Sequence, residues 1–267
     1  MSRVRLDGAT VEVWDEGSGR PVLLLHGFPT TNRLWRGVLP KLAAANCRAV
    51  APDLAGYGLS DADANADVGM ARQASWMRDL IEALGLERPV LVAHDVGSAA
   101  AQIFVARWPE HCRGLVVLDG VYQDNWAMDA VSSIQAWNPS DAHRLFPVLV
   151  RRIRSKSPVS GIPEEVAREV LAPYEGSEGG LRLIRASRAL NPRETAAITD
   201  LLRARRVPSL VLWGSEDRYL TPDAVARPLS ELLGAELKLL PGGHFLPLEA
   251  PGEVAREIIA FLDRIEE

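Results

Sequence analysis

The side chain with the clearest chemical potential in this sequence is the carboxylate of Asp95. An apolar run, Pro89–Val92, leads into Ala-His-Asp-Val-Gly at residues 93–97, and small residues in a helical pattern follow. This order predicts a nucleophile elbow, a buried strand, sharp turn and helix that usually expose a Ser. A carboxylate in that place forms a productive ester with a saturated carbon, whereas attack on an acyl carbon gives an anhydride. Asp95 therefore favours epoxide opening or halide displacement over ester cleavage.

Two further polar residues follow predicted strands. Asp217 lies in Gly-Ser-Glu-Asp at residues 214–217, and His244 lies in Gly-Gly-His-Phe at residues 242–245. Taken singly, each has an ordinary explanation: Asp95 as a helix cap, Asp217 as a turn residue and His244 as a hydrogen-bonded loop histidine. Together they occur in the order nucleophile, acid, histidine, each after its own strand. We therefore predict that Asp95, Asp217 and His244 form a catalytic triad.

A turn that supplies backbone donors is predicted at residues 26–29, His-Gly-Phe-Pro, directly after the apolar run Val22–Leu25. Glycine permits a tight turn, and Pro29 favours an extended conformation for Phe28. We expect the Phe28 N–H to point into the site. Together with the N–H of Val96, it is predicted to form an oxyanion hole that stabilises a negatively charged oxygen.

These residues need a scaffold that brings loops together, and the apolar runs of the chain predict one. Continuous apolar runs fit strands that are covered on both faces. Such runs lie at 22–25, 48–52, 89–93, 114–118, 209–213 and 236–240. Helical patterns lie between and after them, at 34–45, 70–84, 98–108, 222–233 and 251–265. Short strands alternating with helices indicate an α/β fold with a parallel central sheet, whose strand ends meet at one edge.

A helical insertion interrupts this alternation. From residue 121 to about residue 206 no buried strand is evident, and prolines divide a sequence that is rich in Arg and in helical patterns. We therefore predict a core of residues 1–120 and 207–267, with an inserted helical domain at 121–206.

The composition narrows the classes of partner. The formal net charge of the 267 residues is −5, which argues against nucleic-acid binding, so the Arg-rich runs at 151–154 and 203–206 are expected to be solvated helix faces. No apolar stretch approaches the length of a membrane span, and no signal peptide is evident. Cys47 and Cys112 lack the spacing of metal ligands. We expect a cytoplasmic monomer or homodimer that requires no metal or other cofactor.

These motifs, together with Asp-Leu-Ala-Gly-Tyr-Gly-Leu-Ser at residues 53–60, resemble the α/β-hydrolase superfamily. Asp95 places the resemblance in the branch shared by epoxide hydrolases and haloalkane or haloacetate dehalogenases. The resemblance implies an α/β-hydrolase fold, with a mostly parallel central sheet flanked by helices and an inserted helical cap over the active site. It also implies that Asp95 forms an alkyl ester and that His244, oriented by Asp217, activates the hydrolytic water. Some relatives take the acid from the loop that here holds Asp119, so Asp119 stays an alternative.

Several positions depart from the dehalogenases of this branch. Haloalkane dehalogenases hold the halide with a Trp directly after the nucleophile, and haloacetate dehalogenases carry an Arg there, but this chain has Val96. One subgroup adds an Asn in the oxyanion turn, where this chain has Phe28. Trp126 or Trp137 of the insertion could replace these halide donors, although a Trp is more commonly a packing residue.

The epoxide hydrolases of this branch need a proton donor, usually a pair of Tyr in the cap, and Ser187 stands where a Tyr often precedes Arg-Ala-Leu. Tyr122, His143 and Tyr174 are the candidate replacements, with His143 and Tyr174 as the preferred pair. Val96 is compatible with one group of these enzymes. We therefore expect hydrolysis of an epoxide to a diol, on a small and largely apolar substrate, with dehalogenation as the alternative. A repurposed hydrolase scaffold or a ligand receptor without turnover is the further alternative.

Overall fold

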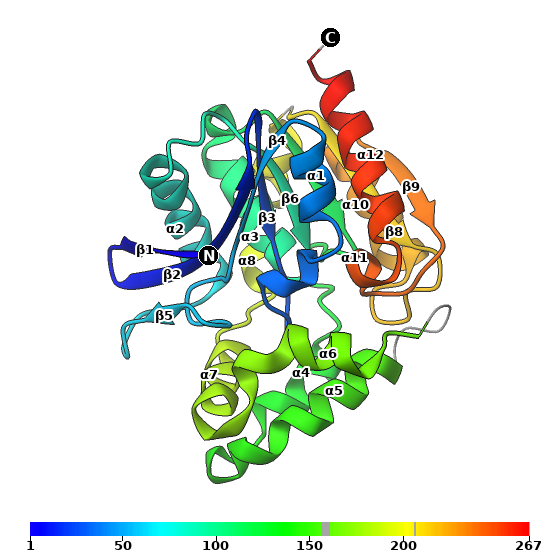
Figure 1. The fold of residues 1–267 in the computed structure, drawn as a ribbon. Coiled ribbons are helices and arrows are strands. Elements are labelled where there is room, and N and C mark those ends of the chain that lie inside the picture. Colours follow the sequence, from blue (N-terminus) through cyan, green and yellow to red (C-terminus); the bar gives the residue numbers. More distant parts are fainter. Residues whose placement is uncertain (156–160, 206, 267) are drawn as a thin grey trace.

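In residues 1–155, 161–205 and 207–266, which the computed structural model describes, the central element is a nine-stranded β-sheet (Figure 1). Its strands are β1 (Ser2–Leu6), β2 (Ala9–Gly17), β3 (Arg20–Leu25), β4 (Cys47–Pro52), β5 (Asp61–Ala62), β6 (Val90–His94), β7 (Gly114–Leu118), β8 (Ser209–Gly214) and β9 (Glu236–Leu240). They are ordered β1-β2-β4-β3-β6-β7-β8-β9, and β5 pairs with β2. Strand β2 is antiparallel to its partners, whereas every pairing from β4 to β9 is parallel.

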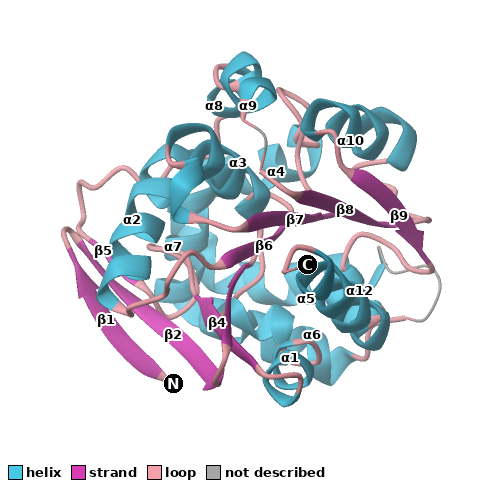
Figure 2. Cartoon of the chain, turned by 90° about the horizontal axis from the view of Figure 1, so that it is seen from above, coloured by secondary structure: helices cyan, strands magenta, loops and turns pink. Residues whose placement is uncertain are grey.

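The parallel strands coincide with the apolar runs of the sequence. Every residue of β6 and β7 is buried, because helices cover both faces of the sheet. Figure 2 shows α2 (Met70–Ala83), α3 (Gly97–Arg107) and α10 (Arg227–Leu233) on one face, and α1 (Leu39–Ala44) and α12 (Pro251–Arg264) on the other. This arrangement is the predicted mostly parallel sheet flanked by helices.

Differences from the predicted elements have local causes. The helical pattern at 34–45 is divided into a 3-10 turn, η1 (Asn32–Trp35), and α1, because Pro40 lacks an N–H and fits only the first turn of a new helix. The pattern at 222–233 begins with a π-helical turn, η5 (Pro222–Ala226), before α10. Strands β1 and β5 were not predicted, since both are largely exposed and lack a continuous apolar run. Short turns η2 (Pro109–His111) and α11 (Leu246–Glu249) complete the core.

Helices make up the insertion between β7 and β8. Its outer part lies beyond the carboxyl ends of the central strands, in the lower part of Figure 1. This outer part contains α4 (Met128–Gln135), η3 (Pro139–Arg144), α5 (Leu145–Ser155), α6 (Glu164–Leu171), η4 (Ala172–Tyr174) and α7 (Gly176–Arg188). The last two helices, α8 (Arg193–Ala196) and α9 (Thr199–Ala204), pack against α3 of the core instead. The insertion therefore has an outer layer that ends with α7 and a return segment on the core.

Polar contacts join the outer layer to loops of the core. The Tyr174 hydroxyl donates to the carbonyl oxygen of Thr30 at 3.0 Å and accepts from the N–H of Gly58 at 3.0 Å. The Arg185 guanidinium donates to the carbonyl oxygen of Asp63 at 2.7 Å. Because the partners lie in loops on the core, these contacts hold the outer helices over the strand ends.

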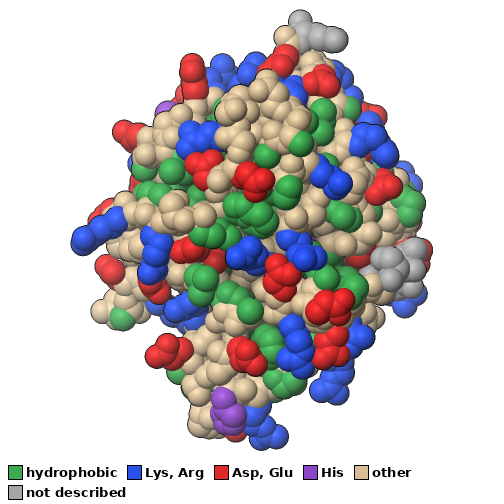
Figure 3. All heavy atoms as spheres, in the orientation of Figure 1, with side chains coloured by type: hydrophobic (Ala, Val, Ile, Leu, Met, Phe, Trp, Pro, Cys, Tyr) green, Lys and Arg blue, Asp and Glu red, His purple; other side chains and the backbone are tan. Residues whose placement is uncertain are grey.

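Charged side chains of both signs are interspersed on the molecular surface. On the face shown in Figure 3, the described Lys and Arg side chains alternate with Asp and Glu and form no continuous basic track of the kind that follows a nucleic-acid backbone. None of the helices in the described part of the chain combines the length and the apolar character that a membrane crossing requires.

Candidate active site

Asp95 occupies the sharp turn between β6 and α3. Its φ of 51° lies in the left-handed region, which non-glycine residues adopt where surrounding contacts hold them. Ser98 stabilises the turn, because its hydroxyl donates to the backbone carbonyl oxygen of Asp95 at 2.6 Å. Gly97 allows close packing, since an added Cβ would lie 2.3 Å from the carbonyl oxygen of His26. The chain thus has a strand, a strained turn and a helix around this carboxylate.

The two carboxylate oxygens of Asp95 have different partners. The backbone N–H of Phe28 donates to Oδ1 at 2.7 Å, and the Val96 backbone adds a further hydrogen bond to the carboxylate. Oδ2 lies 3.5 Å from Nε2 of His244. Phe28 and Val96 are the two residues predicted to supply an oxyanion hole. The Phe28 amide contacts Oδ1 of Asp95, and Oδ2 faces the imidazole.

His244 lies between Asp95 and Asp217. Its Nδ1 is 2.9 Å from Oδ2 of Asp217, whose Oδ1 accepts from the N–H groups of Tyr219 at 2.7 Å and Leu220 at 3.1 Å. These backbone donors fix the orientation of the Asp217 carboxylate, which in turn orients the imidazole. The structure therefore brings together the three residues that the sequence pointed to as a triad.

The charges in this group depend on one another. Burial alone would lower the pKa of His244, but the negative charge of Asp217 and hydrogen bonds to Asp217 and Asp95 raise it well above its ordinary value. Burial alone would raise the pKa of Asp95, but the hydrogen bond and positive charge of His244 lower it. The resting arrangement is consequently a protonated imidazole between two carboxylates.

Asp119, the alternative acid, has a different environment. It follows β7, is fully buried, and accepts from the N–H of Gly214 at 2.7 Å through Oδ1. Its other oxygen has no hydrogen-bond partner among the described residues. Burial and the nearby charge of Asp217 raise the pKa of Asp119 well above its ordinary value. In the described structure the acid that contacts His244 is Asp217.

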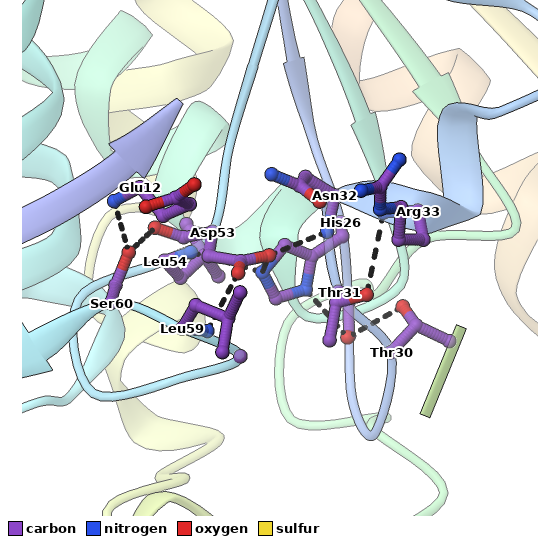
Figure 4. Close-up of polar contacts among 12 residues, drawn as sticks. Glu12, His26, Thr30, Thr31, Asn32, Arg33, Asp53, Leu54, Leu59 and Ser60 are labelled. Atoms are coloured by element: carbon purple, nitrogen blue, oxygen red, sulfur yellow. Dashed lines mark hydrogen bonds and ion pairs between the residues drawn. The ribbon is translucent and has the colours of Figure 1, made fainter. Parts of the chain in front are cut away.

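A buried polar network supports the loop that carries the Phe28 N–H (Figure 4). Asp53 accepts from the N–H groups of Asn32 and Leu59, each at 2.7 Å. Burial raises the pKa of Asp53 to about 6, although both hydrogen bonds oppose this shift. The carboxyl group thereby ties the start of η1 to the loop after β4.

His26 completes this support from inside the turn. Its Nε2 accepts from the N–H of Leu54 at 2.9 Å, and Nδ1 lies 3.0 Å from the carbonyl oxygen of Gly27. One donor and one acceptor are what a neutral imidazole provides. Burial lowers the pKa of His26 to about 4, which keeps the ring neutral at pH 7. His26 is thus a structural residue next to the oxyanion turn.

A cavity of about 490 Å³, including its opening, lies between the core and the insertion and reaches Asp95. Most of its lining is apolar and comes from both parts of the chain. The apolar side chains are Phe28, Pro29, Val96, Leu220 and Phe245 of the core and Trp126, Ala127, Ala130, Val131 and Ile153 of the insertion. A largely apolar lining with a few polar groups is typical of sites for small molecules.

Trp126 is the member of the predicted insertion set that lines the described cavity. Its indole N–H donates to the carbonyl oxygen of Gln123 at 3.0 Å and to Oγ1 of Thr195 at 2.8 Å. An indole has a single N–H, so these contacts within the protein occupy the donor that halide binding would need.

The other predicted residues of the insertion lie away from Asp95. Trp137 and His143 border a separate surface hollow, and Tyr174 is buried in the contact between the insertion and the core. Tyr122 is half-buried at the start of the insertion and is not part of the described cavity lining. The preferred pair, His143 and Tyr174, is therefore not brought to Asp95.

The sequence did not indicate two polar residues that line the cavity, Tyr219 and Arg152. Tyr219 follows Asp217 by two residues, and its ring packs edge-on against His244 with centroids 5.1 Å apart. Arg152 lines the cavity, although its run was expected to be a solvated helix face. Helical spacing could have indicated this position, because Arg152 is three residues after the buried Leu149 and residues three apart lie on the same face of a helix.

Comparison with known proteins finds relatives that cover most of this chain. The chain is 26% identical over 318 aligned positions to an epoxide hydrolase from Caballeronia sordidicola, which covers 98% of this chain and 93% of that protein. It is 27% identical over 259 positions to haloalkane dehalogenase 2 from Mycobacterium bovis, covering 92% and 88%. The crystal structure of a haloalkane dehalogenase from Bradyrhizobium elkani superposes with a TM-score of 0.84 at 24% identity, over 99% of this chain and 98% of that one. This structural likeness concerns the fold.

The sequence pattern of the alpha/beta hydrolase family matches residues 22–257. This match includes the oxyanion turn, the elbow at Asp95 and the loops of Asp217 and His244. The chain therefore belongs to the alpha/beta hydrolase family, and its relatives include epoxide hydrolases and haloalkane dehalogenases.

Proposed function

We propose that this hydrolase opens epoxides to diols through a covalent ester at Asp95. The observation that carries the proposal is that the two oxygens of the Asp95 carboxylate have different partners. Oδ1 accepts from the Phe28 N–H, and Oδ2 lies beside Nε2 of His244. One oxygen occupies the oxyanion site while the other is available to attack a saturated carbon.

In the first step, Oδ2 of Asp95 attacks an epoxide carbon, and the bond between that carbon and the ring oxygen breaks. The oxygen leaves as an alkoxide on the substrate and must take up a proton. We assign Tyr219 as the donor, because it is the hydroxyl-bearing side chain among the described residues that line the cavity. Burial and the charges of Asp217 and Asp95 raise the pKa of Tyr219 to about 12, so the phenol carries its proton at pH 7.

In the second step, His244 activates the water that hydrolyses the ester. Ester formation removes the charge of Asp95, which is one of the groups that keep His244 protonated. The imidazolium then passes its proton to the Tyr219 phenolate, which restores the phenol. The neutral imidazole accepts a proton from water as that water attacks Cγ of Asp95. The new charge develops on Oδ1, next to the N–H groups of Phe28 and Val96, and collapse of the intermediate releases the diol. Removal of one such donor typically costs about 10²–10³-fold in rate.

The outer helices of the insertion serve as a cap in this proposal. Residues of α4, α5 and the segment before α4 form one side of the cavity, opposite the triad. A substrate in this position is enclosed between cap and core, which limits the access of bulk water to the ester. We accordingly propose residues 121–206 as the cap and residues 1–120 and 207–267 as the catalytic core.

Dehalogenation is the second candidate. The relatives named haloalkane dehalogenases support it, and Arg152 brings a cation into the cavity that would attract a halide. Against it, Val96 and Phe28 offer no side-chain donor, and the indole N–H of Trp126 is occupied by Gln123 and Thr195. These observations favour ring opening.

Product analysis separates the two candidates. Purified protein is incubated with 1,2-epoxyhexane, 1-bromohexane and chloroacetate, and diol and halide are quantified. We expect diol without halide release, and we expect Tyr219→Phe to lower kcat for the epoxide by about 10²–10³-fold, the usual scale for general acid catalysis. His111→Gln, at an exposed histidine, is the control. Halide release with no turnover of any epoxide would contradict epoxide hydrolysis and support dehalogenation as the activity.

A further inference from the structure

Arg152 brings a positive charge into the cavity from the cap. Helix α5 buries Leu149 and Ile153, and Arg152 lies beside this face and lines the same cavity as Asp95. The preceding Arg151 is exposed to solvent. The position of Arg152 on the helix therefore places its side chain at the cavity, whereas its neighbour Arg151 in the same Arg-rich run is exposed.

The charge of Arg152 is not neutralised within the described structure. Its Nη1 donates to the carbonyl oxygen of Ala130 at 2.7 Å and its Nη2 to Oγ of Ser133 at 2.8 Å, and both acceptors are uncharged. No carboxylate of the described chain forms an ion pair with it, whereas Arg154 on the same helix pairs with Glu164 at 3.0 Å. A guanidinium has five N–H donors, so it retains donors for a further partner.

Tyr219 connects Arg152 to the reacting groups. The charges of Arg152, Asp217 and Asp95 all act on the phenol, and all these residues except Asp217 line the same cavity as Tyr219. Its ring also contacts the imidazole of His244. A small molecule in this cavity is therefore lined by Arg152, Tyr219 and Asp95 together.

We propose that Arg152 binds a carboxylate on the substrate, so that this hydrolase prefers small anionic electrophiles to neutral ones. The inference rests on the proposed reaction at Asp95 and adds the substrate class. It departs from the expectation of a largely apolar substrate.

Electrostatics gives the physical reason for this preference. The resting triad carries two carboxylates and one imidazolium, so its net charge repels an anion. Arg152, which is half-buried, offsets part of that repulsion from the insertion side of a cavity whose lining is mostly apolar. A planar guanidinium also matches the two oxygens of a carboxylate, which favours this anion over a spherical one.

A matched pair of epoxides tests the proposal. Oxirane-2-carboxylate and oxirane-2-carboxamide have nearly the same shape and differ in charge. For Arg152→Gln we expect kcat/KM to fall about 10²-fold on the carboxylate, as expected when one partner of a desolvated charge pair is removed, and less than about 3-fold on the amide. Arg151→Gln removes the adjacent exposed charge and is the matched control, with less than about 3-fold change on either substrate.

A second variant separates recognition from a structural role. Ser133→Ala removes one hydrogen bond that ties Arg152 to α4 but leaves the guanidinium. If Arg152 only tethers the helices, Arg152→Gln and Ser133→Ala lower activity on both substrates alike, and the proposal is wrong. If Arg152→Gln does not fold, Arg152→Lys replaces it, and we expect a partial loss confined to the carboxylate, because the charge stays and the two-pronged contact is lost.

A binding measurement distinguishes failure of this inference from failure of the proposed reaction. Propionate and propionamide are titrated calorimetrically into the wild type and Arg152→Gln. If propionate binds in a way that depends on Arg152 but neither epoxide is turned over, the anion site is supported and epoxide hydrolysis is contradicted. If both epoxides give diol with equal efficiency and Arg152→Gln has no effect, the proposed reaction is supported and the anion site is contradicted.

Discussion

At the scale of single residues, the surroundings of two carboxyl groups decide which one supports the histidine. Asp217 and Asp119 both follow strands of the sheet, but Asp217 contacts His244 at 2.9 Å and receives two backbone N–H groups. Asp119 receives one N–H, from Gly214, and its pKa is raised by burial and by Asp217. These contacts make Asp217 the acid that orients the imidazole and leave Asp119 bonded to the backbone of Gly214.

Conservative substitutions at these two residues should have unequal effects. We predict that Asp217→Asn lowers kcat by roughly 10³- to 10⁴-fold, because the imidazole loses its orienting charge. Asp119→Asn should keep kcat within about 3-fold, since no hydrogen bond joins Asp119 to His244 in the described structure and the Asn side-chain oxygen still accepts from Gly214. Steady-state rates on one epoxide measure both. Equal losses in the two variants would mean that the acids share the role.

At the scale of elements, the reaction site depends on how closely the oxyanion turn approaches the elbow. A Cβ added at Gly27 would lie 2.4 Å from both Cβ and Oδ1 of Asp95. A Cβ added at Gly97, on the elbow side, would lie 2.3 Å from the carbonyl oxygen of His26. The glycines on both sides therefore allow the backbone N–H of Phe28 to reach the carboxylate at hydrogen-bond distance.

Gly27→Ala tests this close approach. The new methyl group must displace either the nucleophile or the turn, so we predict a fall in kcat of at least about 10²-fold, the scale of losing one oxyanion donor. The free energy of unfolding should fall by about 1–3 kcal/mol, the usual cost of overpacking. Gly252→Ala is the matched control, because nothing lies within 4 Å of its added Cβ. Full activity in Gly27→Ala would contradict the role given to this turn.

The central strands and the loops that follow them were predictable from the sequence, and the cap side of the cavity was not. Runs such as 89–93 and 114–118 are apolar throughout, and the structure buries β6 and β7 completely. Because parallel strands end at one edge, the order of Asp95, Asp217 and His244 was enough to suggest their meeting.

Side chains of the cap depend on how separate helices pack, which local periodicity does not encode. Tyr174 and His143 were expected to form a pair, but Tyr174 lies in the contact with the core and His143 is on the surface. Arg152 and Tyr219 come from segments far apart in the chain and line the same cavity. Their shared location follows from tertiary packing.

At the scale of the whole molecule, buried histidines link the stability of the fold to pH. His94 directly precedes Asp95, and its Nε2–H donates to the backbone carbonyl oxygen of His244 at 2.7 Å. Burial, together with the positive charge of His244, lowers the pKa of His94 to about 4. The unfolded chain protonates this ring near its ordinary value of 6.5, so unfolding takes up a proton between these two pH values. The contribution of neutral His94 to the free energy of unfolding is therefore complete above pH 6.5 and is lost as the pH falls toward 4.

His94→Gln should weaken this acid sensitivity. One proton corresponds to a slope of about 1.4 kcal/mol per pH unit, and we predict that the variant's slope between roughly pH 4.5 and 6 is smaller by about this amount. Urea unfolding at several pH values measures the slope. Val92→Ala on the same strand is the control, because it destabilises the core without changing a titratable group. Parallel pH curves for the wild type and His94→Gln would show that His94 is not the responsible group.

The central claim, a covalent ester on Asp95 that His244 resolves, is tested most directly by trapping the ester. His244→Gln retains the nucleophile but lacks the base, so incubation with a turned-over epoxide should add the mass of one epoxide to the intact protein. Peptide mapping should place that mass on Asp95, and Asp95→Ala should neither gain mass nor form diol. The account predicts accumulation of this adduct in His244→Gln. Diol formation by Asp95→Ala, or an unmodified Asp95 in His244→Gln while the wild type turns over the same epoxide, would contradict it.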